Sequence, residues 1–233
     1  MSDSNTENHT EPTRQALASV IRAFLDSEST AFEFDEQLDE FCGSSDPVIR
    51  YVVDAVWYHY DDCDDHLVCL SKQEWDFFQR LLLLLASDCV VETESRRIWS
   101  LRQVIAATSL AVFTYFAVQA GWGYHLLLLA VPFGAISMLL SQTRPAPPMD
   151  SDPYLPIIFP FESLSDLART YRSSPFRKTR YPKSLSNRQI RSPSMHAFHL
   201  LHSYIVWLLL SPFPLFAQCF PHSETDVRVK ATS

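Results

Sequence analysis

A run of carboxylates and imidazoles at residues 59–66 has the residue types of a metal site. It contains four aspartates and two histidines within eight residues. Carboxylate oxygens and imidazole nitrogens are common ligands of hard or borderline divalent cations. The candidate ligands are His59, Asp61, Asp62, Asp65 and His66. A metal-dependent membrane enzyme that uses this set is one hypothesis for the function.

The same run fits no established metal-binding or catalytic pattern. The EF-hand pattern fails because glycine is missing from its sixth position and glutamate from its twelfth. The chain has no GxSxG motif and no Gly-rich phosphate loop, and acidic neighbours disfavour a thiolate at Cys63 beside His66. The alternative is a solvated acidic loop between two helices, compensated by basic residues of this chain or of a neighbour. On that interpretation the protein has no resident cofactor.

Helix start signals divide residues 11–88 into four expected helices. They are a first-turn proline, two capping boxes and a cap followed by proline: Pro12, Thr30 with Glu33, Ser71 with Glu74, and Asp46 with Pro47. The last helix contains the run Leu81–Leu85, which is too short to span a membrane and suits the central helix of a bundle. We therefore expect an acidic helical domain at 11–88, after a disordered leader at 1–10.

The segment 104–140 contains no Asp, Glu, Lys or Arg. Two antiparallel helices of about 17 residues, joined at Gly121-Trp122-Gly123, would fit a transmembrane or re-entrant hairpin. Small residues would let the two helices approach closely, namely Ala107 with Ala111 and Ala130 with Gly134. The alternative is the buried hairpin of a soluble core, but the remaining chain is too small to cover so many apolar residues.

Residues that flank this hairpin predict its orientation. Trp99, Trp122 and Tyr124 lie where interfacial aromatic side chains are expected. Arginines stand on both sides, at positions 96, 97, 102 and 144. By the positive-inside rule both ends, and with them the helical domain and a connector at 89–103, are expected in the cytoplasm. Five cysteines without a CxxC pair agree with a reducing compartment.

A Pro-rich and basic segment is predicted at 141–196, lying along the membrane surface or against the helical domain. Ser163 and Asp166 are expected to cap a short helix within it. Its basic residues suit anionic lipid headgroups, with an attraction of about 1 kcal/mol for each residue. Lipid is a more favoured ligand than nucleic acid because the segment follows a membrane hairpin. These residues are Arg169, Arg172, Arg177, Lys178, Arg180, Lys183, Arg188 and Arg191.

A third hydrophobic segment at 197–220 precedes a tail at 221–233. Pro212 and Pro214 interrupt it, so it could span the membrane, lie in the interface or pack on the hairpin. His196, His199 and His202 stand at its entrance. Without a clear third ligand, they are interpreted as interfacial histidines rather than a zinc site.

The expected fold class is all-α: a small cytoplasmic helical bundle, then a two-helix transmembrane or re-entrant hairpin, then a third apolar helical segment. Residues 1–100 carry 21 acidic and 7 basic side chains, whereas residues 101–233 carry 6 and 12. This split favours a membrane-anchored, non-enzymatic interaction or regulatory module. Its expected partners are anionic lipids and another protein or a second copy, not nucleic acid. A transporter or channel is disfavoured because the hairpin carries no intramembrane charge.

Overall fold

The computed structural model describes residues 13–61, 63–142 and 154–230. The leader expected at 1–10, Pro12 and the prolines between positions 145 and 153 lie outside these ranges. The chain divides into two compact units. The helical domain comprises residues 1–93, 152–190 and 227–233, and the hydrophobic unit comprises residues 94–151 and 191–226.

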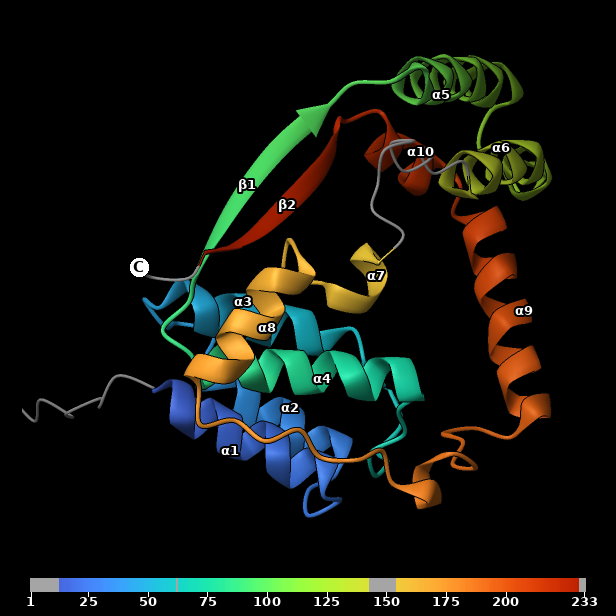
Figure 1. The fold of residues 1–233 in the computed structure, drawn as a ribbon. Coiled ribbons are helices and arrows are strands. Elements are labelled where there is room, and N and C mark those ends of the chain that lie inside the picture. Colours follow the sequence, from blue (N-terminus) through green and yellow to red (C-terminus); the bar gives the residue numbers. More distant parts are fainter. Residues whose placement is uncertain (1–12, 62, 143–153, 231–233) are drawn as a thin grey trace, which may run out of the picture. The chain divides into compact units, whose positions relative to one another are not determined.

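Four helices open the helical domain, as the start signals predict (Figure 1). They are α1 (Arg14–Leu25), α2 (Ala31–Asp39), α3 (Pro47–Trp57) and α4 (Lys72–Leu85). Both predicted capping boxes form, at Thr30 and at Ser71. The carboxylate of Asp46 accepts a hydrogen bond from the Val48 amide at 2.8 Å, so the third predicted start is also confirmed.

The core of the helical domain is centred on α4. The side chains of Leu81–Leu85 are all buried, because α4 packs against both α1 and α3. Phe24 of α1 stacks on Phe34 of α2 with ring centroids 4.3 Å apart, and Tyr60 meets both rings edge-on. The interpretation of the leucine run as the central helix of a bundle is thus confirmed.

The segment 154–190 is part of this domain. It forms α7 (Leu155–Ile158), α8 (Leu164–Ser173) and the short 3-10 helix η1 (Lys183–Leu185). Ser163 caps α8, as predicted, by accepting a hydrogen bond from the Asp166 amide. Phe161 and Leu185 are buried in the same core as the α1–α4 side chains. Of the two placements that the sequence allowed for this segment, packing against the helical domain is the one observed.

A two-stranded sheet corrects the expectation of an all-α fold. Strands β1 (Val90–Ile98) and β2 (His222–Lys230) lie side by side in Figure 1. They occupy the predicted connector and the predicted tail. Each strand carries β-branched residues between charged ones, a weak signal alone, and its backbone is satisfied only by a partner more than a hundred residues away. Val91 and Val229 enter the core of the helical domain.

The hydrophobic unit contains the predicted hairpin, α5 (Leu101–Ala120) and α6 (His125–Gln142). Gly121 turns the chain between them with φ +72°, a conformation that glycine adopts without strain. α9 (Pro193–Leu209) and α10 (Pro212–Gln218) follow later and are bent by 80° at their junction. α6 packs against α5, α9 and α10, so it is the central helix of this unit.

The small-residue pairs do not act as expected. On α5, the residues that pack are Ala106, Leu110 and Phe113, and the faces of Ala107 and Ala111 are exposed. A Cβ atom on Gly134 would lie 2.7 Å from the Leu208 Cα atom, so this glycine admits the α9 backbone rather than α5. The small residues correctly indicated a close helix contact at Gly134, but the helix that makes it is α9 and not α5.

Hydrogen bonds between helices hold the hydrophobic unit together. Trp207 Nε1 donates to Ser137 Oγ at 3.1 Å, and Gln218 Nε2 donates to the Ser137 carbonyl oxygen at 3.0 Å. Ser211 Oγ donates to the Ala130 carbonyl oxygen at 2.9 Å. Polar contacts of this kind fix the packing of helices in an apolar environment.

A partly buried arginine gives the helical domain a predicted pH dependence. Arg14 Nε contacts Asp46 Oδ2 at 2.6 Å, and its Nη1 donates to the carbonyl oxygens of Ser87 and Cys89. Burial alone would raise the pKa of Asp46, but hydrogen bonds from Arg14 and the Val48 amide outweigh it and lower that pKa. The stability that the ionised Asp46 contributes is therefore present above about pH 3.9 and lost as the pH falls through its lower folded-state pKa.

The substitution Asp46→Asn should isolate this charge, because asparagine remains a good helix cap. We expect it to lower the free energy of unfolding at pH 7, and the difference from the wild-type chain to shrink below about pH 4. Denaturant titrations at several pH values would measure both effects. Glu36→Gln, on the exposed face of α2, is the control. An unchanged difference across this pH range would contradict the assignment.

Candidate functional site

The histidine that begins the predicted metal cluster faces α4. His59 Nδ1 lies 3.5 Å from Glu74 Oε1, and its ring contacts the rings of Phe77 and Phe78. Burial alone would raise the pKa of Glu74, but hydrogen bonds from Ser71 and His59 outweigh it and lower that pKa. His59 therefore packs beside the capping box of α4.

The other described members of the cluster shape the loop. His66 Nε2 accepts a hydrogen bond from the Asp61 amide at 3.0 Å, and its Nδ1 lies 2.8 Å from the Leu67 carbonyl oxygen. Asp65 Oδ1 accepts a hydrogen bond from the Phe32 amide, which holds the pKa of Asp65 below its usual range. Asp62 lies outside the described residues. Within the described ranges, no three His, Cys, Asp or Glu side chains are grouped to hold a metal ion.

Three of the cations predicted to face lipid have partners within the helical domain. Lys178 Nζ lies 2.6 Å from Asp76, and Arg169 lies 2.7 Å from Asp166. Arg188 donates to Ser27 Oγ and to the Val68 carbonyl oxygen. The remaining members of the set are half-exposed or exposed: Arg172, Arg177, Arg180, Lys183 and Arg191.

The predicted interfacial aromatics are well exposed. Trp122 and Tyr124, at the turn between α5 and α6, are 99% and 91% exposed, and Trp99 is 70% exposed. On α9 the ring of Phe198 lies near those of His199 and His202, at 6.2 and 6.4 Å between centroids. These histidines join no metal-binding group among the residues described.

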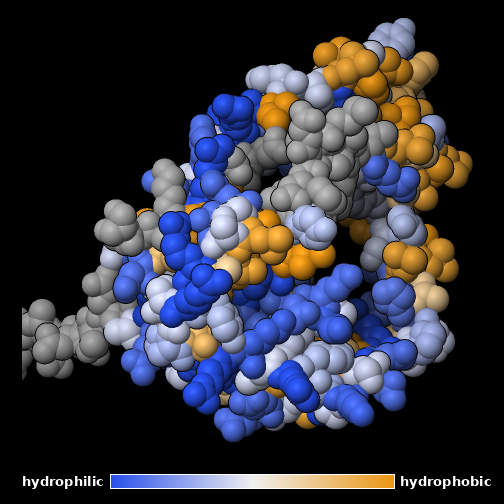
Figure 2. Space-filling model, in the orientation of Figure 1, coloured by the Kyte–Doolittle hydropathy of each residue, from blue (hydrophilic) through white to orange (hydrophobic). Residues whose placement is uncertain are grey.

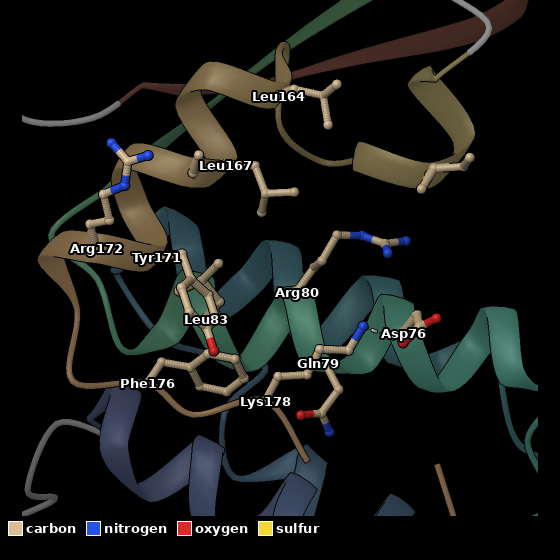
Figure 3. A pocket seen from close by; sticks show the side chains of 12 residues that line it. Asp76, Gln79, Arg80, Leu83, Leu164, Leu167, Tyr171, Arg172, Phe176 and Lys178 are labelled. Atoms are coloured by element: carbon tan, nitrogen blue, oxygen red, sulfur yellow. Dashed lines mark ion pairs between the residues drawn. The ribbon is translucent and has the colours of Figure 1, made fainter. Parts of the chain in front are cut away.

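A pocket that the sequence did not indicate lies in the helical domain between α4 and the α7–α8 segment (Figure 3). Its volume is about 440 Å³. Leu83 and Arg80 come from α4, and Leu164 and Leu167 face them from α8. The remaining lining residues are Asp76, Gln79, Ile157, Ala168, Tyr171, Arg172, Phe176 and Lys178.

Three cations and one carboxylate line this pocket, namely Arg80, Arg172, Lys178 and Asp76. Arg80 Nε donates to the Phe159 carbonyl oxygen at 2.6 Å, and its Cζ lies 5.8 Å from the centroid of the Phe77 ring. Burial lowers the pKa of Arg80, although an arginine remains protonated at neutral pH. Lys178 is already paired with Asp76. Arg80 has no carboxylate within ion-pair distance among the described residues, although the charge of Asp76 acts on it from farther away.

In the sequence, Arg80 stands directly before the run Leu81–Leu85, and no motif marks it as a binding residue. No local pattern could have revealed the pocket, because α4 and α8 are about eighty residues apart in the chain. Comparisons with models of protein families, with curated proteins and with solved structures find no match to this chain. The function is accordingly derived from the chain's own geometry.

Proposed function

We propose that this chain is an integral membrane protein whose hydrophobic unit anchors a helical domain that acts as a non-enzymatic interaction or regulatory module. The observation that carries the anchor is the surface of α5 and α6. These helices have 20 and 18 residues, and only 11% and 28% of their most apolar windows are buried. Figure 2 shows hydrophobic residues gathered over them. A monomer in water would not leave so large an apolar surface uncovered.

The path of the chain supports an even number of membrane crossings. The chain leaves the helical domain after residue 93 and is back in its core at Phe161. It leaves again after Arg188, which is bonded to the domain, and is back in its core at Val229. Each excursion must therefore begin and end on the same face of a bilayer.

Two crossings by α5 and α6 satisfy the first excursion. The second contains one bent helix pair, α9 and α10, long enough together for a single crossing. A single crossing would leave Val229 on the wrong face, so we infer that this pair enters and returns as a re-entrant loop. Its bend of 80° suits such a path, and its hydrogen bonds to α6 supply the protein contacts that irregular backbone at membrane depth needs.

The arginines around the hairpin favour a cytoplasmic helical domain. On that face, the exposed cations Arg177, Arg180 and Lys183 could contact anionic headgroups. The acidic loop that contains Asp61 and Asp65 offers a surface of opposite charge to a basic partner protein or a second copy. No observation favours the metal-dependent enzyme over this module.

Cysteine labelling in sealed cells tests the topology. Cys63 is exposed in the helical domain and serves as the natural reporter. We expect a membrane-impermeant maleimide to label Cys63 only after permeabilisation. Trp122→Cys, in a chain that also carries Cys42→Ser and Cys63→Ser, should be labelled in intact cells because it marks the distal turn.

A third reporter tests the re-entrant loop. Ser223→Cys, at the beginning of β2 and in the same cysteine-reduced chain, should behave like Cys63. Labelling of this position from outside would overturn the re-entrant path. Labelling of Cys63 in intact cells would overturn the orientation, and extraction of the protein by alkaline carbonate would overturn the membrane anchor itself.

The interaction role has its own test. Binding partners recovered by chemical crosslinking in intact membranes would be compared between the wild-type chain and a variant with Asp61→Asn and Asp64→Asn. We expect a specific partner to be lost from the variant. Identical crosslinked products in both chains would contradict a role for the acidic surface.

A further inference from the structure

We propose that the pocket between α4 and α8 binds one acyl chain that carries an anionic head group. This assigns a ligand site to the helical domain, and it depends neither on the orientation in the membrane nor on a protein partner. The argument rests on three features: the apolar walls, the position of Arg80, and the size of the pocket.

The walls are mostly hydrocarbon. Leu83, Leu167 and Phe176 form the inner part, and Figure 3 shows Leu167 directed from α8 toward α4. The outer part includes Leu164 and Ile157, which are 53% and 63% exposed. Apolar side chains left uncovered around an open pocket gain stability when an apolar ligand covers them. A hydrocarbon chain is the ligand part that these walls fit.

A cation lies beside those walls. Arg80 has no carboxylate within ion-pair distance among the residues that the structure describes, and only its Nε has a hydrogen-bond acceptor. In Figure 3 its guanidinium extends from α4 along the pocket. The terminal nitrogens of an arginine form strong paired hydrogen bonds with carboxylates and phosphates. An anionic head group placed there would supply a direct ion-pair partner for Arg80.

The pocket is also small. Among its lining residues, Lys178 is 51% exposed and is paired with Asp76. A volume of about 440 Å³ lies at the lower end of the range for ligand sites, so one chain is favoured over a ligand with two. Free fatty acids and anionic lysophospholipids both combine one acyl chain with an anionic head group. They differ in that head group and in their source.

Photocrosslinking of the full-length protein in neutral phosphatidylcholine nanodiscs tests the site. The probe is a long-chain fatty acid with a diazirine on its chain, and the crosslinked peptides are identified by mass spectrometry. We expect crosslinks in the peptides of α4 and α8. Unlabelled oleate and oleoyl lysophosphatidate compete in separate arms, and the stronger competitor identifies the source. Crosslinks confined to α5, α6, α9 or α10 would overturn the proposal.

Two variants distinguish the contribution of the anionic head group to binding from that of the acyl chain. Arg80→Gln should weaken binding of oleate about tenfold or more, because a charge-assisted pair is lost. Ala168→Phe, which adds a ring to the pocket wall and leaves Arg80 in place, should also abolish specific crosslinking. Arg169→Gln is the matched control, since Arg169 is paired with Asp166 and does not line the pocket. Thermal unfolding would show that each variant is folded.

A neutral ligand gives the decisive comparison. Oleyl alcohol has the chain of oleate without its charge, and we expect it to compete at least about tenfold more weakly. Equal competition by oleate and oleyl alcohol would overturn the anionic head group. If a folded Ala168→Phe variant still bound the probe, the pocket would not be the site that holds the acyl chain.

Discussion

Replacement of Phe161 by alanine is expected to lower the free energy of unfolding of the helical domain by about 3–5 kcal/mol. Phe161 is 1% exposed and belongs to a core otherwise built mostly from α1–α4. Removing its ring would leave a cavity that the surrounding helices cannot fill, because they are fixed by their caps and by one another. A single change in the segment 154–190 would thus destabilise helices far away in the sequence.

Denaturant unfolding of the full-length protein in detergent, followed by the fluorescence of Trp75, would measure this loss. Trp75 is a suitable reporter because it is buried, lies edge-on to the Tyr181 ring at 5.9 Å, and donates to the Thr179 carbonyl oxygen. Phe32→Ala is the matched control, since Phe32 is 45% exposed in the same domain. If both variants lost equally little stability, the segment 154–190 would not be an integral part of the core.

The second large effect is expected from Gly134→Ala in the hydrophobic unit. The added methyl group would lie 2.7 Å from both the Cα atom and the carbonyl oxygen of Leu208. Both are backbone atoms, so α9 as a whole must move away from α6. Overpacking of this kind costs about 1–3 kcal/mol, and the displacement would also break the hydrogen bond from Trp207 to Ser137.

Thermal unfolding in detergent, monitored by size-exclusion chromatography after heating, would report the loss as a lower Tm. The emission of Trp207 should shift as its indole loses Ser137. Ala111→Val is the control, because it adds volume on the exposed face of α5. An unchanged Tm in Gly134→Ala would mean that α9 does not approach α6 as closely as described. Alanine is otherwise the better helix former, so a destabilised variant could not be explained by helix propensity.

Local signals predicted the local structure well. The capping boxes at Thr30 and Ser71 and the glycine turn at Gly121 each depend on residues within a few positions, and all three form. The exposed apolar surfaces of α5 and α6 likewise agree with the predicted membrane hairpin. That prediction depended on a run of apolar residues that is continuous along the sequence.

Long-range contacts are what the sequence could not provide. The strand at 90–98 becomes recognisable only through its partner at 222–230, and the charges of both strands conceal their β-branched residues. The pocket needs α8 to dock beside α4, and Gly134 needs Leu208 opposite it. The metal-site hypothesis for the acidic run around Asp61 stays a prediction. The residue types of this run suit a metal, but its described side chains are used by nearby backbone groups.

The discontinuous make-up of the helical domain has a consequence for its biogenesis. A ribosome completes the first 93 residues before it has synthesised Phe161, Leu185 or Val229, all of which are buried in the core that those residues begin. Val229 follows both hydrophobic excursions along the chain. The nascent domain must therefore keep part of its apolar interior uncovered until both hydrophobic excursions have been synthesised. We therefore expect chaperones to bind the early helices during synthesis. We also expect a chain truncated before β2 to have a destabilised helical domain.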